Sequence, residues 1–159
     1  MNMISCKNNY GQLGILPKEK FKFRPSVYGI IRHADKICIC KLKSNGKIWF
    51  TGGGIDPGET REAALLREID EETGLKNITV GRLLGSFENF FCYQPEDWAM
   101  HAFLFFYECH AHDTVFREND KLDDEYDFQW IDANRIKKEE LADLNEEIFN
   151  LLSIYAHRD

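Results

Sequence analysis

Three glutamates, Glu68, Glu71 and Glu72, are spaced so that a helix would gather their carboxylates on one face. At about 100° per residue, Glu71 and Glu72 fall about 60° and 40° to either side of Glu68. Like charges this close raise one another's pKa unless a cation lies among them. Hard divalent cations such as Mg²⁺ take oxygen ligands of this kind, so the spacing indicates a metal site. Taken alone, the same triplet is also typical of a solvated helix face.

A glycine-rich loop and well-marked helix ends surround these glutamates. Gly52, Gly53 and Gly54 precede them, and residues without a Cβ atom let a backbone approach a metal ion or a phosphate closely. Thr60 is suited to cap a helix, and Gly74 is suited to end it in the left-handed conformation. We therefore predict a helix over about 60–73 whose apolar stripe, Leu65, Leu66 and Ile69, packs into the core.

The complete register of this segment is more specific than the glutamates alone. It reads Gly53, five residues, Glu59, seven residues, Arg67-Glu68-Ile69, one residue, Glu71-Glu72, one residue, Gly74-Leu75. The segment resembles the Nudix box, G-x5-E-x7-R-E-U-x-E-E-x-G-U with U aliphatic, at every fixed position. In outline the resemblance extends further, because strand-like segments precede the box and Trp130 with a short helical stretch follows it.

The resemblance implies roles for the residues of the box. Glu68, Glu71, Glu72 and the carbonyl of Gly52 would bind Mg²⁺, with Mn²⁺ as a substitute. One glutamate, in the first place Glu68, would accept a proton from the attacking water, and Glu71 is also counted among the catalytic residues. Glu59 would support Glu68, and Arg67 would orient the carboxylates. An exposed ion pair of Arg67 with Glu71 is the alternative for the arginine.

Two expectations concern residues outside the helix. Family members often add a carboxylate from a loop before the last strand, which here makes Glu125, or its neighbour Asp124, a candidate metal ligand or base. A solvated loop is the alternative. Gly53, Gly54 and Phe50 are expected at the substrate, where Phe50 would stack on a base, although core packing would explain an aromatic residue there equally well.

The remaining pattern predicts an α+β fold in one domain. Apolar, β-branched segments favour strands over 26–33, 36–42, 48–50, 79–91, 99–109 and 126–131, and helical spacing favours helices over 133–141 and 145–157. Strands and helices in this order indicate a mixed sheet covered by helices. The resemblance implies an α/β/α sandwich with a loop-helix-loop catalytic motif. We predict an N-terminal extension over 1–24 and the Nudix hydrolase domain over 25–159.

Composition restricts the partners. The net charge of −7 disfavours an extended nucleic-acid surface. The longest apolar run, 102–107, is too short to span a bilayer, and the polar N-terminus favours a cytoplasmic protein. Five cysteines without a C-x-x-C pair indicate reduced thiols, and Cys38 and Cys40 are expected to pack as small apolar residues. A small nucleotide is the expected partner, with a homodimer left open.

The expected function is that of a Mg²⁺-dependent pyrophosphohydrolase that cleaves a nucleoside diphosphate linked to another moiety. A nucleoside triphosphate with a standard or oxidised base, giving monophosphate and pyrophosphate, is the favoured substrate. The alternatives are nucleotide sugars of the ADP-ribose type and dinucleoside polyphosphates. Phe90 and Phe91 stand where ADP-ribose hydrolases usually have a proline, and Tyr93 is only weak support for the dinucleoside class. A noncatalytic nucleotide sensor is disfavoured because every glutamate of the box is present.

Overall fold

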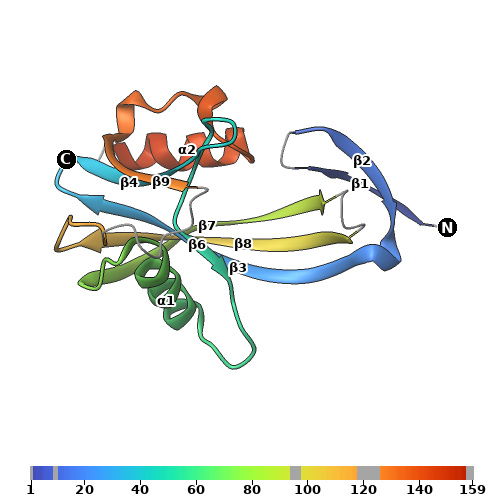
Figure 1. Ribbon diagram of the computed structural model, residues 1–159, viewed down its shortest axis with the longest axis horizontal. Coiled ribbons are helices and arrows are strands. Elements are labelled where there is room, and N and C mark those ends of the chain that lie inside the picture. The colour runs from blue at the N-terminus through green and yellow to red at the C-terminus, as the bar shows by residue number, and fades with distance from the viewer. Residues whose placement is uncertain (1, 9–10, 94–97, 118–125, 157–159) are drawn as a thin grey trace.

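A mixed β-sheet forms the centre of the protein, and one helix covers each side of it (Figure 1). The computed structural model describes residues 2–8, 11–93, 98–117 and 126–156. In this part of the chain the strands follow the order β2-β1-β7-β8-β3-β4-β5, with β6 paired to β3 and β9 paired to β4. The strands are β1 Met3–Lys7, β2 Leu13–Pro17, β3 Phe21–His33, β4 Lys36–Leu42, β5 Ile48–Trp49, β6 Gly52–Gly54, β7 Ile78–Tyr93, β8 Trp98–Ala111 and β9 Tyr126–Asp132.

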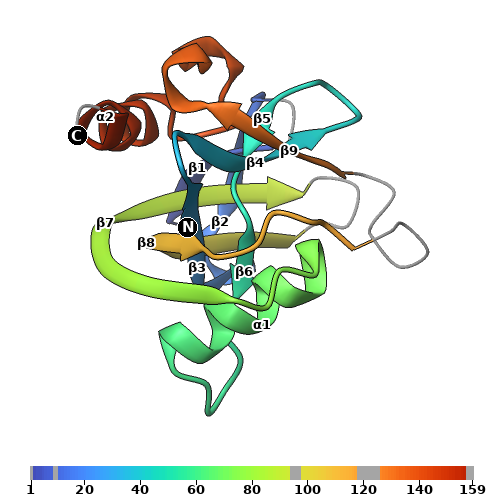
Figure 2. The same cartoon turned by 90° about the vertical axis from the view of Figure 1, so that its left-hand side faces the viewer.

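The long strands β3, β7 and β8 carry the core on both of their faces. β3 runs parallel to β8, whereas β7 and β8 are antiparallel, so the sheet is mixed as predicted. Because successive side chains of a strand point to opposite faces, Val27 and Ile31 pack toward α1 while Ile30 packs into a second cluster with Ile148 of α2. Figure 2 shows the two helices on opposite sides of the sheet.

Helix α1, Arg61–Thr73, has the predicted ends. Thr60 caps it, with Oγ1 accepting a hydrogen bond from Ala63 N at 3.1 Å, and Gly74 ends it at a φ of 77°. Its buried stripe differs in one respect from the prediction: Leu66 is only half-buried, and Ala64 is fully buried in its place. The small side chain of Ala64 packs closely against the sheet, together with Leu65 and Ile69.

The C-terminal part corrects one predicted element. The helix expected over 133–141 is two short 3₁₀ helices, η3 Ala133–Arg135 and η4 Lys138–Glu140. Between them Ile136 is extended and buried, because its side chain inserts into the core and interrupts a continuous helix. Helix α2, Asn145–Ala156, follows as expected and buries Ile148 and Leu152.

Residues 1–24 contain two strands that the sequence did not reveal. β1 and β2 form a hairpin, and β1 joins the edge of the sheet where Lys7 pairs with Phe91. Cys6 is the buried residue of β1, so the strand lacks the alternating apolar pattern that predicts strands. The division into an extension over 1–24 and a domain over 25–159 stays a prediction.

The cysteines pack as expected. All five are buried, and Cys38 and Cys40 on β4 are 0% and 5% exposed. Burial raises the pKa of the Cys38 thiol to about 12, which keeps it protonated at neutral pH. In the part of the chain that the structure describes, no helix is long and apolar enough to cross a membrane.

Candidate functional site

The loop of strand β6 lies directly against the glutamate-bearing face of α1. A Cβ atom on Gly53 would lie 2.7 Å from the carboxyl carbon of Glu68, so only glycine permits this approach. Gly52 has a φ of 147°, and a Cβ there would lie 2.1 Å from the carbonyl oxygen of Val27 on β3. Contacts with the backbone of β3 therefore require glycine at residue 52, and the absence of a Cβ atom at residue 53 leaves the space that the Glu68 carboxylate occupies beside the loop.

Glu72 connects the helix to the same loop. Its Oε2 accepts a hydrogen bond from Gly52 N at 3.0 Å, and the side chain is half-buried. Glu68, one turn earlier, has a side chain that is 17% exposed. Glu68 and Glu72 thus both face β6, as the helical spacing predicts.

Arg67 organises the carboxylates around this face. Its Nε and Nη2 donate to both oxygens of Glu59 at 2.7 and 2.9 Å. Its Nη1 donates to Glu68 Oε1 at 2.9 Å and to Glu71 Oε2 at 3.2 Å, and Nη2 also donates to the Gly54 carbonyl at 3.1 Å. These contacts go well beyond an exposed pair with Glu71, because one guanidinium joins three carboxylates to the glycine loop.

This network separates the electrostatic roles of the glutamates. Hydrogen bonds from Arg67 and from the backbone N–H of Asp56 lower the pKa of Glu59 to about 2. In return, the hydrogen bonds of Arg67 to Glu59 and then to Glu68 raise the pKa of the guanidinium above its ordinary value. Glu59 is therefore ionised at any neutral pH and touches Arg67 rather than Glu68. It supports Glu68 through the guanidinium, while Glu71, with 59% of its side chain exposed, lies at the outer side.

The donor set fits a hard divalent cation in its chemistry. Carboxylate oxygens of Glu68 and Glu72 both lie against a loop whose backbone carries no Cβ atoms at Gly52 and Gly53. Among the described residues, however, no group of three or more metal-binding side chains is already assembled. Binding of Mg²⁺ by Glu68, Glu71, Glu72 and the Gly52 carbonyl stays a prediction.

Three of the candidate site residues either lie in the core or fall outside the described residues. Phe50 is 2% exposed and packs edge-on against Phe106 with ring centroids 6.3 Å apart, so core packing, the alternative, is what the structure has. Buried there, it has no face for a base. Asp124 and Glu125 lie outside the described residues.

Sequence reasoning also missed a cation beside the loop. The guanidinium of Arg24 on β3 would lie 3.2 Å, at Nε, from a Cβ atom placed on Gly54. β3 and β6 pair from Ser26 to Tyr28, and this pairing brings residue 24 next to residue 54. No motif in the sequence joins them, and only the strand register reveals the contact.

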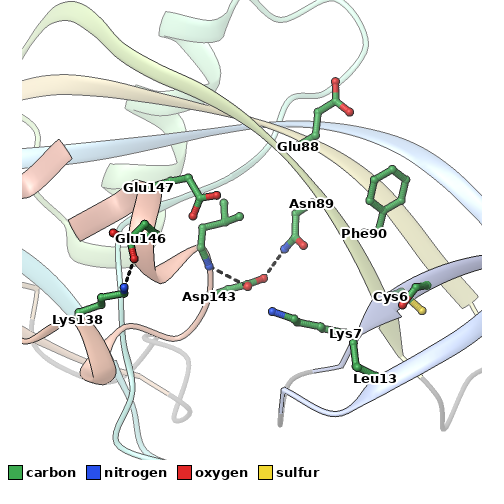
Figure 3. A pocket seen from close by; sticks show the side chains of 12 residues that line it. Cys6, Lys7, Leu13, Glu88, Asn89, Phe90, Lys138, Asp143, Glu146 and Glu147 are labelled. Atoms are coloured by element: carbon green, nitrogen blue, oxygen red, sulfur yellow. Dashed lines mark hydrogen bonds and ion pairs between the residues drawn. The ribbon is translucent and has the colours of Figure 1, made fainter. Parts of the chain in front are cut away.

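A pocket of about 460 Å³ lies apart from these residues, between the β1–β2 hairpin, β7 and the start of α2 (Figure 3). Asn89 donates a hydrogen bond to Asp143 there, and Lys7 extends into the pocket from β1. Glu68, Glu71, Glu72 and the glycine loop do not line it. The pocket shows that the N-terminal hairpin, outside the predicted domain, shapes the α2 side of the molecule.

Comparison with known proteins agrees with this geometry. The model of the NUDIX domain matches residues 22–152, which is most of the chain and includes β6 and α1. The chain belongs to the Nudix family. Crystal structures of a Nudix hydrolase from Nitrosomonas europaea and of a UDP-X diphosphatase have TM-scores of 0.67 and 0.60 at 14% and 24% identity. They cover 98% and 86% of this chain, and it covers 88% and 65% of theirs. This likeness confirms the α+β sandwich.

Curated relatives of this Nudix protein carry different activities in their names. An ADP-ribose pyrophosphatase from Methanocaldococcus jannaschii is 43% identical over 65 residues, covering 38% of either chain. A nucleoside triphosphatase NudI from Enterobacter is 43% identical over 56 residues, 32% of this chain and 40% of the relative. An RNA pyrophosphohydrolase from Campylobacter jejuni is 38% identical over 64 residues, 36% of this chain and 41% of the relative. The chain thus spans about two fifths of the length of these relatives.

Proposed function

We propose that this Nudix protein is a divalent-metal-dependent pyrophosphohydrolase that cleaves a nucleoside diphosphate linked to another group. The observation that carries the proposal is the network in which Arg67 holds Glu68 at the glycine loop, beside Glu72. A structural helix face would not need a glycine at residue 53 to accommodate a carboxylate. The arrangement instead places carboxylates where a loop backbone is open to a ligand.

The residues of the site have different roles in such a hydrolysis. A bound Mg²⁺ supplies charge neutralisation and lowers the pKa of water. Glu68 is the general base of the proposal, because Arg67 fixes one of its oxygens and leaves the carboxylate directed at the loop. Glu59 is unsuited to that role, since its pKa of about 2 makes it a poor proton acceptor. Glu72 fixes the loop through Gly52 N, and Glu71 completes the acidic face.

The favoured substrate is a nucleoside triphosphate with a standard or oxidised base, cleaved to monophosphate and pyrophosphate. The named triphosphatase supports this class, whereas the ADP-ribose pyrophosphatase supports nucleotide sugars as the second candidate. Dinucleoside polyphosphates are a further alternative. With the substrate we also propose a cytoplasmic enzyme that acts on small nucleotides, with Mg²⁺ or Mn²⁺ as its metal, and a homodimer stays an open alternative.

A panel assay tests the proposal. Purified protein with Mg²⁺ is incubated with nucleoside triphosphates, nucleotide sugars and dinucleoside polyphosphates, and the products are separated by anion exchange. We expect monophosphate and pyrophosphate from triphosphates, loss of turnover in EDTA, and loss of turnover in Glu68→Gln. Glu62→Gln, an exposed glutamate in the first turn of α1, is the matched control and should keep parental turnover. Absence of hydrolysis across the panel would refute the proposal.

A further inference from the structure

Arg24 adds a second positive charge, besides that of Arg67, next to the glycine loop. The residue is exposed on β3, and its guanidinium lies over Gly54, at 3.2 Å (Nε) and 3.3 Å (Nη2) from where a Cβ would be. The φ angle of Gly54 is one that any residue can adopt, so its backbone conformation does not require glycine. What the missing side chain provides is space beside the backbone. The third glycine of the loop therefore makes room for an arginine.

The charge of Arg24 is not neutralised within the described part of the chain. Its side-chain hydrogen bond there runs from Nη1 to the sulfur of Met100 at 3.4 Å, and no described carboxylate lies within ion-pair distance. This differs from Arg67, whose donors are occupied by three glutamates and the Gly54 carbonyl. A guanidinium whose N–H donors are not taken up by carboxylates is suited to phosphate oxygens, because its planar pair of donors can bind two of them at once.

Arg24 also lies near the glutamates that would hold the metal. Its guanidinium lies at Gly54, whose carbonyl accepts a hydrogen bond from Nη2 of Arg67, and Nη1 of Arg67 donates to Glu68. The Glu68 carboxylate itself lies at the Cβ position of Gly53, the neighbouring residue of the loop. A phosphate chain bound at the loop would meet carboxylate-held metal on one side and a guanidinium on the other.

We propose that Arg24 is a substrate-binding residue of this site and that its guanidinium binds non-bridging oxygens of the substrate's phosphate chain. The inference rests on the proposed function and deepens it. A nucleoside triphosphate has a terminal phosphate that a nucleotide sugar lacks, and therefore presents more negative charge to Arg24. Arg24 then favours triphosphates over nucleotide sugars.

Binding of inorganic pyrophosphate in the presence of Mg²⁺, measured by isothermal titration calorimetry, tests the contact without turnover. Hydrogen bonds to charged groups predict that Arg24→Ala weakens binding roughly 10- to 100-fold. Arg24→Lys should lie between, because an ammonium is a point charge without the fork. Lys22→Ala is the matched control: it removes an exposed positive charge two residues away on the same face of β3 and should change binding less than about twofold.

A second variant tests whether the position of the Arg24 guanidinium depends on the missing side chain of Gly54. In Gly54→Ala the new Cβ would displace the guanidinium by a few tenths of an ångström, so pyrophosphate binding should weaken less than in Arg24→Ala. In the Arg24→Ala background the same change should add nothing, because its partner is gone. Thermal unfolding of each variant confirms that it is folded before binding is compared.

The outcomes separate the two proposals. Arg24→Ala with parental pyrophosphate affinity, or a loss matched by Lys22→Ala, would overturn the inference even if the parent hydrolyses nucleotides. An Arg24-dependent pyrophosphate affinity in a parent that hydrolyses no nucleotide would support the anion site and refute the proposed reaction. If both hold, kcat/KM of Arg24→Ala should fall more for a triphosphate than for a nucleotide sugar, and an equal fall would refute the preference for triphosphates.

Discussion

Replacement of Glu59 by glutamine tests whether the Arg67 network positions the base. Glu59 takes two of the guanidinium's hydrogen bonds, at 2.7 and 2.9 Å, and the other bonds reach Glu68, Glu71 and the Gly54 carbonyl. An amide keeps the shape of the side chain but replaces one acceptor with a donor that faces Arg67. Arg67 then keeps one of its two hydrogen bonds to residue 59, and it holds Glu68 less firmly in its orientation.

The expected size follows from the role of a supporting partner. Loss of a residue that orients a metal-binding or catalytic carboxylate costs about 10- to 100-fold in activity, which corresponds to about 1.4 to 2.7 kcal/mol of transition-state stabilisation. Glu59 contacts Arg67 and not the part of the glycine loop where we propose that the substrate binds. The loss of activity should therefore appear in kcat, with little change in KM. Steady-state kinetics on the best substrate of the panel measure both, with Glu62→Gln as the control.

The pH dependence of stability gives a readout independent of turnover. The folded-state pKa of Glu59, about 2, lies below its ordinary value of 4.5. A carboxyl with a lowered pKa contributes stability that is present above the ordinary value and is lost as the pH falls toward the folded value. Between pH 4.5 and 2 the free energy of unfolding should therefore fall more steeply in the parent than in Glu59→Gln. Equal slopes together with parental kcat would show that the network has no positioning role.

Three further predictions concern the metal, the core and the loop before β9. Glu72→Gln should cut turnover at least ~10²-fold with the fold intact. EDTA should abolish turnover without unfolding the protein, and activity in EDTA would contradict a metal mechanism. Replacing Cys38 and Cys40 by alanine should lower the free energy of unfolding by about 1 to 2 kcal/mol each, yet leave turnover per folded molecule near the parental value, as measured by denaturant titration and kinetics. Asp124→Asn or Glu125→Gln should lower single-turnover rates by ~10- to 10³-fold if either completes the site, whereas parental rates in both would confine the machinery to the loop and helix.

Much of the fold was predictable because its signals are local. Strands β4, β5, β7, β8 and β9 and both long helices match the predicted ranges closely, since alternation and helical spacing are properties of neighbouring residues. β3 begins at Phe21, five residues before the predicted start, and β6 was predicted as a loop, because their pairing with β8 and β3 is set by residues far away in the sequence. The N-terminal hairpin was missed because β1 buries Cys6 alone. The 133–141 segment was wrongly predicted because burial of Ile136 overrides a local helical preference.

The residue order alone was enough to predict the local geometry of the candidate site: which glutamates share a helix face, that Thr60 caps the helix and Gly74 ends it, and that glycines precede it. Caps and periodicity act within a turn or two of helix, so they are written in the residue order. The burial of Phe50 in the core and the position of Arg24 over Gly54 became visible in the folded chain alone. Those contacts depend on the register between β3 and β6, which long-range packing selects and no local pattern records.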